Sequence, residues 1–154
     1  MILDERTEFA DATALGTGGT GRALVGDVVD LTSIGRSLGS SGKQMFMVLQ
    51  VDTTVTSGGS ATVSFELATD AQAAIATDGT ATVHFASAAI PKATLVAGYT
   101  VAVIALPLET PTYERYLGIL QNVGTAALTA GKINAFLTMD PAVWKAYDNG
   151  IAAV

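Results

Sequence analysis

The sequence predicts an all-β protein with one domain over residues 1–154 and about eight strands, arranged as a sandwich or barrel. Three observations predict this class. Apolar and polar residues alternate with a period of two along several segments, which is the pattern of strands with one buried face. Turn residues separate these segments, and the chain contains 16 glycines. Segments with helical character are few and short. A chain of 154 residues suits one domain with a sizeable core.

The N-terminal half is expected to supply four strands. Residues 1–9 form a weak edge strand, and the apolar run within residues 21–31 contains a second strand. Residues 43–52 are apolar on both faces, as expected of a strand that is covered on each side. Residues 61–67 alternate strictly and follow a Ser-Gly-Gly-Ser turn at 57–60. We therefore expect these last two strands to form a β-hairpin.

The C-terminal half repeats the pattern. Residues 80–86 follow an Asp-Gly turn, and residues 99–106 form a strand that stops at Pro107, because proline cannot donate to a sheet ladder. Residues 115–123 and 132–139 flank a loop and are expected to pair as a second hairpin. The alternation predicts a core that includes Met47, Leu49, Val63, Phe65, Val101, Val103, Leu117, Ile119, Phe136 and Leu137.

Helical signals occur in two places. Residues 68–78 have a helical composition, but their position between strands and the following Gly79 favour a loop. Asp140 and Pro141 are the residue types of an N-cap and of a first helical position. We therefore expect a short C-terminal helix over residues 140–147.

The glycine-rich segment at residues 16–21, GTGGTG, matches the G-x-G-x-x-G spacing of dinucleotide-binding loops. That chemistry also needs a strand that leads into the loop and a helix that directs its N–H groups at the pyrophosphate. The preceding residues are mostly acidic or small, and the β-branched residues after Arg22 are poor helix formers. Since no βαβ unit is predicted in the chain, we interpret residues 16–21 as a flexible connector and assign no cofactor.

Composition argues against several classes of function. The chain has no cysteine, which excludes disulfides, zinc–thiolate sites and cysteine nucleophiles. Its net charge is −6 and its basic residues are scattered, so we expect no nucleic-acid partner. The N-terminus is acidic where a secretion signal is basic, and the longest apolar run, residues 101–106, is far shorter than a membrane span. We expect a soluble protein without a membrane partner, made in the cytoplasm.

Candidate catalytic and metal-binding residues do not form a recognisable set. His84 is the only histidine and lies in a predicted strand, without a G-x-S-x-G elbow to supply a nucleophile, so we expect a structural role for it. Asp52, Glu66 and Asp70 lie in or near one predicted hairpin, where they would form at most a weak cation site. Solvated carboxylates are the simpler interpretation. We assign no catalytic residue and no metal, and expect that the protein is not an enzyme.

Several short segments resemble, in the same order, the small jelly-roll cement proteins that decorate the capsids of some tailed bacteriophages. Each segment is apolar and of modest specificity, so their shared order carries the resemblance. The segments are residues 1–15, VVDL at 28–31, MFMVLQVD at 45–52, SFELATD at 64–70, YERYLGI at 113–119 and GKINAFLTMD at 131–140. The glycine-rich insert at 16–21 departs from the family pattern, which leaves the path of residues 12–24 open.

The resemblance implies a jelly-roll-like antiparallel sandwich bound to the outer surface of an icosahedral phage head. There the protein would bridge neighbouring major capsid proteins and stabilise the shell against the pressure of packaged DNA. It would be made in the host cytoplasm and end in the virion. Because a clamp that holds two capsid subunits is most simply built from two identical patches, we expect a homodimer, with a trimer as the alternative. The resemblance supplies no active-site residues.

We expect partner contacts from both ends of the chain. The N-terminal arm, residues 1–10, places Ile2, Leu3 and Phe9 among charged residues, and Trp144 and Tyr147 are aromatic residues in the C-terminal segment. Tyr and Trp are enriched in interfaces. These five residues are therefore the candidate partner interface, with the capsid or with a second copy. An arm paired to its own sheet, and aromatic residues packed in the core, remain open alternatives.

Two other functions are compatible with a β-sandwich. A carbohydrate-binding module of a phage fibre or glycosidase would need an exposed aromatic platform, for which Trp144 and Tyr147 are the candidates. A small enzyme of the cupin type would need several histidines around a metal, and a single histidine disfavours it.

Overall fold

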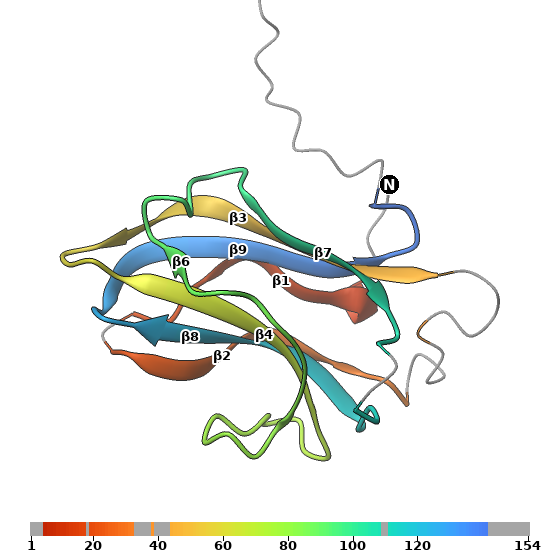
Figure 1. The fold of residues 1–154 in the computed structure, drawn as a ribbon. Coiled ribbons are helices and arrows are strands. Elements are labelled where there is room, and N and C mark those ends of the chain that lie inside the picture. The colour runs from red at the N-terminus through yellow and green to blue at the C-terminus, as the bar shows by residue number, and fades with distance from the viewer. Residues whose placement is uncertain (1–4, 18, 33–37, 39–43, 109–110, 142–154) are drawn as a thin grey trace, which may run out of the picture.

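The protein is a sandwich of two antiparallel sheets (Figure 1). The computed structural model describes residues 5–17, 19–32, 38, 44–108 and 111–141. The four-stranded sheet has the order β1 (Glu8–Ala14), β9 (Leu128–Thr138), β3 (Met45–Ser57) and β7 (Thr100–Leu106). The five-stranded sheet has the order β2 (Gly21–Asp30), β8 (Tyr116–Gly124), β4 (Thr62–Asp70) and β5 (Thr82–Ala86), with the short β6 (Ile90–Pro91) also paired to β4. Within these residues the helical element is one 3₁₀ turn, Glu5–Thr7.

The strand order is that of a jelly roll. The first strand pairs with the last, and the second pairs with the one before the last, so the two halves of the chain alternate across both sheets. The predicted all-β sandwich of about eight strands is therefore confirmed. The expected C-terminal helix lies almost wholly in residues 142–154, outside the described residues.

Both predicted hairpins are wrong, although the predicted strands exist. β3 and β4 belong to different sheets, and so do β8 and β9. The connections at residues 58–61 and 125–127 carry the chain from one sheet to the other. Packed sheets lie about 10 Å apart, a distance that a few extended residues can span. Turn-forming residues therefore suit a crossing between sheets as well as a hairpin.

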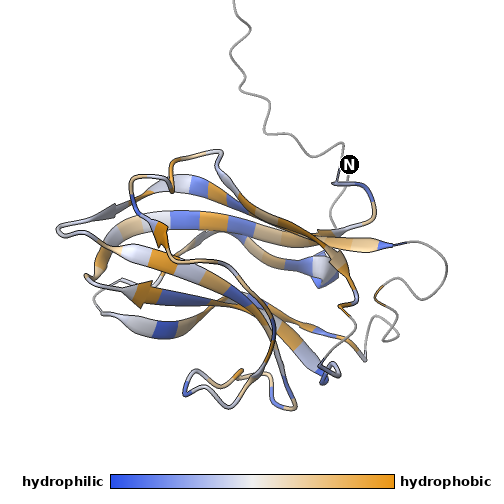
Figure 2. Cartoon of the chain, in the orientation of Figure 1, coloured by the Kyte–Doolittle hydropathy of each residue, from blue (hydrophilic) through white to orange (hydrophobic). Residues whose placement is uncertain are grey.

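Most of the predicted core residues are buried, and apolar residues recur along the strands of both sheets (Figure 2). Two of them are not: Val101 is only partly buried, and Val103 has 50% of its surface exposed. A register shift separates the pair Leu49–Ala102 from the pair Gln50–Thr100. Because of this shift, Val101 and Ala102 both pack against the core, and the following residue faces outward. Simple alternation along β7 could not predict that irregularity.

The glycine-rich connector leads from one strand into another, not into a helix. Its first residue is held on both sides: the Gly16 N–H donates to Oε1 of Gln121 at 2.8 Å, and the Gly16 carbonyl accepts from Nε2 at 3.2 Å. The Gln121 side chain is buried between the sheets, so this contact also satisfies its amide. The interpretation of residues 16–21 as flexible therefore does not hold at Gly16.

The loop expected over residues 68–78 is confirmed only from residue 71 on, because residues 68–70 form the end of β4. The connection 71–81 packs onto the outer face of the five-stranded sheet. Ile75 from this loop is buried with Ala68 and Leu120, which lie on two central strands. Gly118 makes the contact possible, because a Cβ there would lie 2.6 Å from the Cδ1 atom of Ile75. The loop thus has a small apolar cluster of its own.

The longer connections gather at one end of the sandwich, which we call the loop end. It is the end at which β2, β4, β7 and β9 finish, and it holds the connections 31–44, 71–81 and 107–115. The register places the start of β1 and the end of β9 there too, because Glu8 pairs with Phe136 and Thr138 pairs with Phe46. In Figure 1 the tight β3–β4 and β8–β9 connections lie on the left, at the opposite end.

Candidate functional site

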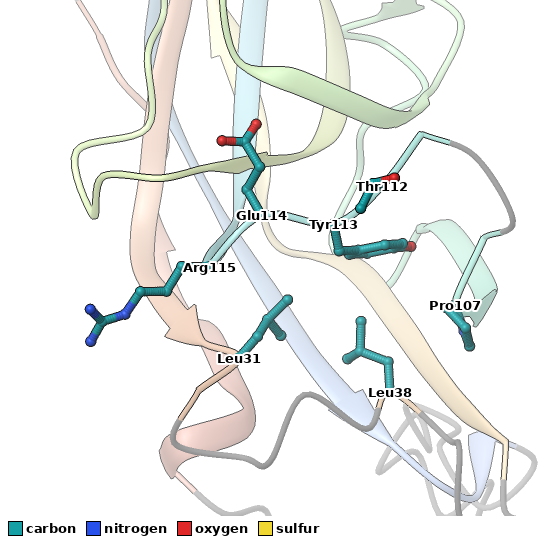
Figure 3. A pocket seen from close by; sticks show the side chains of 7 residues that line it. All are labelled: Leu31, Leu38, Pro107, Thr112, Tyr113, Glu114 and Arg115. Atoms are coloured by element: carbon teal, nitrogen blue, oxygen red, sulfur yellow. The ribbon is translucent and has the colours of Figure 1, made fainter.

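The loop end contains a pocket of about 370 Å³ between the two sheets. It lies where the β2–β3 and β7–β8 connections meet. Its lining residues are Leu31, Leu38, Pro107, Thr112, Tyr113, Glu114 and Arg115. Figure 3 shows Leu31, Leu38 and Tyr113 around the hollow, with Pro107 opposite, while the guanidinium of Arg115 points away from it. The pocket therefore has apolar walls and a polar rim, an arrangement that suits an apolar side chain of a partner.

The Tyr113 wall of the pocket is held by its neighbours. The Tyr113 hydroxyl accepts a hydrogen bond from the Leu108 N–H at 3.0 Å, and burial raises the pKa of this phenol. Its ring stacks on His84, with 3.8 Å between the ring centroids and 12° between the planes. Nε2 of His84 lies 2.7 Å from the Thr69 hydroxyl, which also accepts from the Glu114 N–H at 3.2 Å. These contacts join β4, β5 and the segment before β8.

His84 makes the contacts of a structural residue. Its ring is stacked on one side and hydrogen-bonded on the other, and the Thr69 hydroxyl that it meets is fully buried. Burial lowers the pKa of His84, while the negative charge of Glu114 opposes this effect. The Glu114 carboxylate in turn accepts from the Thr82 hydroxyl at 2.7 Å. His84 therefore supports the Tyr113 wall of the pocket through its ring stacking and its contact with Thr69.

The rim is tied together by a two-point ion pair. Nη2 and Nε of Arg115 donate to the Asp30 carboxylate at 2.9 and 3.2 Å, and the Leu31 N–H donates to the Arg115 carbonyl at 2.9 Å. The Arg115 hydrogen bonds lower the pKa of Asp30 to about 2. The guanidinium also lies 4.8 Å from the centre of the Tyr116 ring. The end of β2 and the start of β8 are thus joined beside the pocket.

One of the predicted interface residues is placed by the structure, and that prediction is wrong. Phe9 is 1% exposed and belongs to the core between the sheets. Residues 8–10 pair with β9, which turns the Phe9 side chain inward. The alternative of an arm paired to its own sheet therefore holds for these residues. Ile2, Leu3, Trp144 and Tyr147 lie outside the described residues.

The carboxylates proposed as a weak cation site do not converge. Glu66 pairs with Arg22 at 3.0 Å, Asp70 accepts the backbone N–H groups of Gln72 and Ala76, and Asp52 accepts from the Thr53 hydroxyl. Among the described residues, no group of three histidine or carboxylate side chains is placed to hold a metal ion.

The structure also has no helix, in its described part, of the length and apolarity that a membrane span requires.

Sequence reasoning missed most of the pocket. Leu31, Pro107 and Thr112 lie in connections far apart in the chain, and only the jelly-roll order brings these connections together. Tyr113 begins the segment YERYLGI at 113–119, but nothing in that segment indicates a pocket. The prolines at 107 and 111 were the available signal, because they indicate a restrained connection between two strands.

Three large apolar side chains are exposed among the described residues: Val96, Val103 and Met139. Val103 lies on β7, Met139 follows β9, and Val96 lies in the connection that leads into β7. All three therefore belong to the four-stranded sheet or adjoin it.

Comparison with protein-family models places the chain in a family. The Bbp16 family model matches residues 9–137. The chain belongs to the Bbp16 family. The match begins within β1 and ends within β9, so the family's sequence pattern extends over the whole sandwich. No curated protein matches the chain.

Proposed function

We propose that this protein is a structural virion protein, a capsid cement protein that binds the outer surface of an icosahedral phage head and bridges neighbouring major capsid proteins. The observation that carries the proposal is the order of the cement-like segments. They fall on consecutive parts of one jelly roll: 45–52 on β3, 64–70 on β4, 113–119 at the start of β8 and 131–140 on β9. Membership of the Bbp16 family, over the same residues, is compatible with this assignment.

The loop end is the part of the molecule best suited to face the capsid. It combines an apolar pocket with the start of β1 and the end of β9, which lie side by side because Glu8 pairs with Phe136. Ile2 and Leu3 precede this point, and Trp144 and Tyr147 follow it. Each apolar side chain of this kind contributes about 1.5–3 kcal/mol when it is buried on a partner, before the cost of ordering the segment.

Many such contacts, repeated over a shell, would slow its rupture even if each contact were weak. A bridging protein must itself resist unfolding without disulfides, since the chain has no cysteine. The continuous core between the sheets meets that need. A homodimer would supply two identical capsid-binding surfaces, one for each neighbouring subunit.

The test is co-sedimentation of the purified protein with capsids that lack it, using two variants with the same substitution at opposite ends. Thr112→Arg adds a bulky charge at the exposed rim of the pocket, and Thr129→Arg adds it on an exposed position of β9 far from the pocket. We expect Thr129→Arg to bind like wild type and Thr112→Arg to bind roughly tenfold more weakly, about 1.4 kcal/mol.

Equal binding by both folded variants would contradict the assignment of the loop end. Absence of binding by the wild-type protein would contradict the cement function itself. Binding to a glycan array by a protein that ignores capsids would favour a carbohydrate-binding module.

A further inference from the structure

β7 is an exposed edge of the four-stranded sheet. It pairs with β3 on one side, and no described residue makes a backbone hydrogen bond to its other side. Its sequence, TVAVIAL, contains no charged residue and no proline before Pro107. From Ala102 to Leu106 the pairing with β3 is regular. Edge strands of this kind readily pair with another strand, and proteins usually protect them.

The other three edges carry such protection. β1 has two register shifts, includes Asp11 and holds Ala12 at a positive φ of 45°. β2 is interrupted at Gly26 and bears Arg22 and Asp27. β1 and β2 also lie against each other, which closes that side of the sandwich. β5 is only five residues long and contains a register shift against β4. β7 also contains one register shift, near its start, but its run from Ala102 to Leu106 is the longest uninterrupted pairing without a charged residue among the four edges of the described sheets.

An apolar row leads to this edge across the outer face of the sheet. Val103 pairs with Val48 on β3, and Val48 pairs with Phe136 on β9. Their neighbours along β3 and β9 point into the core, so these three side chains lie on the opposite face. Val48 and Phe136 are buried, whereas half of the Val103 surface is exposed. The row therefore ends in an uncovered valine at the open edge.

We propose that β7 pairs in antiparallel fashion with β7 of a second copy of this chain, so that the two four-stranded sheets form one continuous sheet. A two-fold axis near Val103 would set this residue against Val103 of the partner subunit and continue the apolar row into the second sheet.

The absence of charge on β7 allows a second copy to approach at this edge. Each chain carries a net charge of −6, so two copies repel each other overall, and this repulsion is smallest where the pairing surface itself has no charged residue. Two-fold pairing places each residue near the axis opposite the same residue of the second copy, so a charged residue there would face a like charge. β7 presents no such residue in any register. Two copies of the strand can therefore pair through main-chain hydrogen bonds without opposing like charges.

This inference deepens the proposed function, since it assigns the surface of the expected homodimer, but its test needs no capsid. The measurement is the solution mass by light scattering after size exclusion, at tens of micromolar protein. Wild type is expected at about 31 kDa, twice the chain mass of 15.7 kDa. Val103→Lys sets two ammonium groups opposite each other and is expected to shift the mass to 15.7 kDa. Val96→Lys, at an equally exposed valine outside β7, is expected to remain dimeric.

Cross-linking tests the register. The wild-type chain has no cysteine, so Val103→Cys introduces a unique thiol. Directly opposed residues in antiparallel strands have Cβ atoms about 4.5–5.5 Å apart, within reach of a disulfide after a small adjustment. Under mild oxidation Val103→Cys is expected to form a covalent dimer and Val96→Cys to remain monomeric on a denaturing gel.

A monomeric wild type, or a folded Val103→Lys protein that stays dimeric, would overturn the proposal. The proposed function can fail separately: a dimer that Val103→Lys dissociates but that does not bind capsids keeps the β7 interface and removes the cement assignment. Circular dichroism melts of each variant verify that the sandwich is intact.

Discussion

Phe9→Ala separates a structural role of the N-terminal arm from a contact role. Phe9 is among the largest fully buried side chains, in the core between the two sheets, and its removal leaves a cavity beneath β1. Phe-to-Ala changes at such positions cost about 3–5 kcal/mol. For a domain of this size, each kcal/mol lowers the melting temperature by roughly 2–4 °C. We therefore expect Phe9→Ala to melt roughly 6–20 °C below wild type by circular dichroism.

Phe46→Ala is the matched control, because Phe46 is only half-buried and lies outside the core cluster. It is expected to lose less than half as much stability. Since Phe9 belongs to the core, a test of the contact role of Ile2 and Leu3 must delete residues 1–4 alone. This deletion should weaken capsid binding and leave the melting temperature close to that of wild type. A Phe9→Ala protein that melts like wild type but no longer binds capsids would refute this reasoning.

Three further predictions concern the backbone and the ionisable groups. Gly26→Ala should lower the free energy of unfolding, measured in urea, by more than about 1 kcal/mol. The φ of Gly26 is +68°, and a Cβ there would overlap the Phe9 carbonyl. Arg115 lowers the pKa of Asp30, so the ion pair stabilises the fold fully above the ordinary aspartate pKa, and this stabilisation is lost as the pH falls toward 2. Asp30→Asn should therefore make the melting temperature less dependent on pH below about pH 4. Burial lowers the pKa of His84, so stability should fall as pH drops below about 6.5, and His84→Gln should remove that dependence.

The strands were predictable because the alternation of apolar and polar residues that marks a half-buried strand is local in the sequence. The strict alternation at residues 61–67 lies on β4, and Pro107 ends β7 where expected. Strand pairing was not predictable in the same way. The turn at 57–60 has the residues of a hairpin, but β3 and β4 lie in different sheets, because a short connection can also cross the sandwich.

The candidate site depended on the same non-local information. Leu31 and Tyr113 face one pocket because β2 lies beside β8, an arrangement that neither segment encodes by itself. Val103 shows a smaller effect of the same kind, since one register shift in β7 turns it from the core to the surface. In contrast, Phe9 could have been assigned to the core if residues 8–14 had been recognised as a strand paired with β9.

The central claim is that this jelly roll binds the outside of a capsid through its loop end. The most direct measurement is a cryo-EM reconstruction of capsids that lack the protein, after incubation with the purified wild-type chain. The account predicts sandwich-shaped density on the outer surface, across seams between major capsid proteins, with the pocket formed by Leu31, Pro107 and Tyr113 turned toward the shell. A bare capsid surface at saturating protein, or a sandwich bound through the β3–β4 and β8–β9 connections, would contradict it.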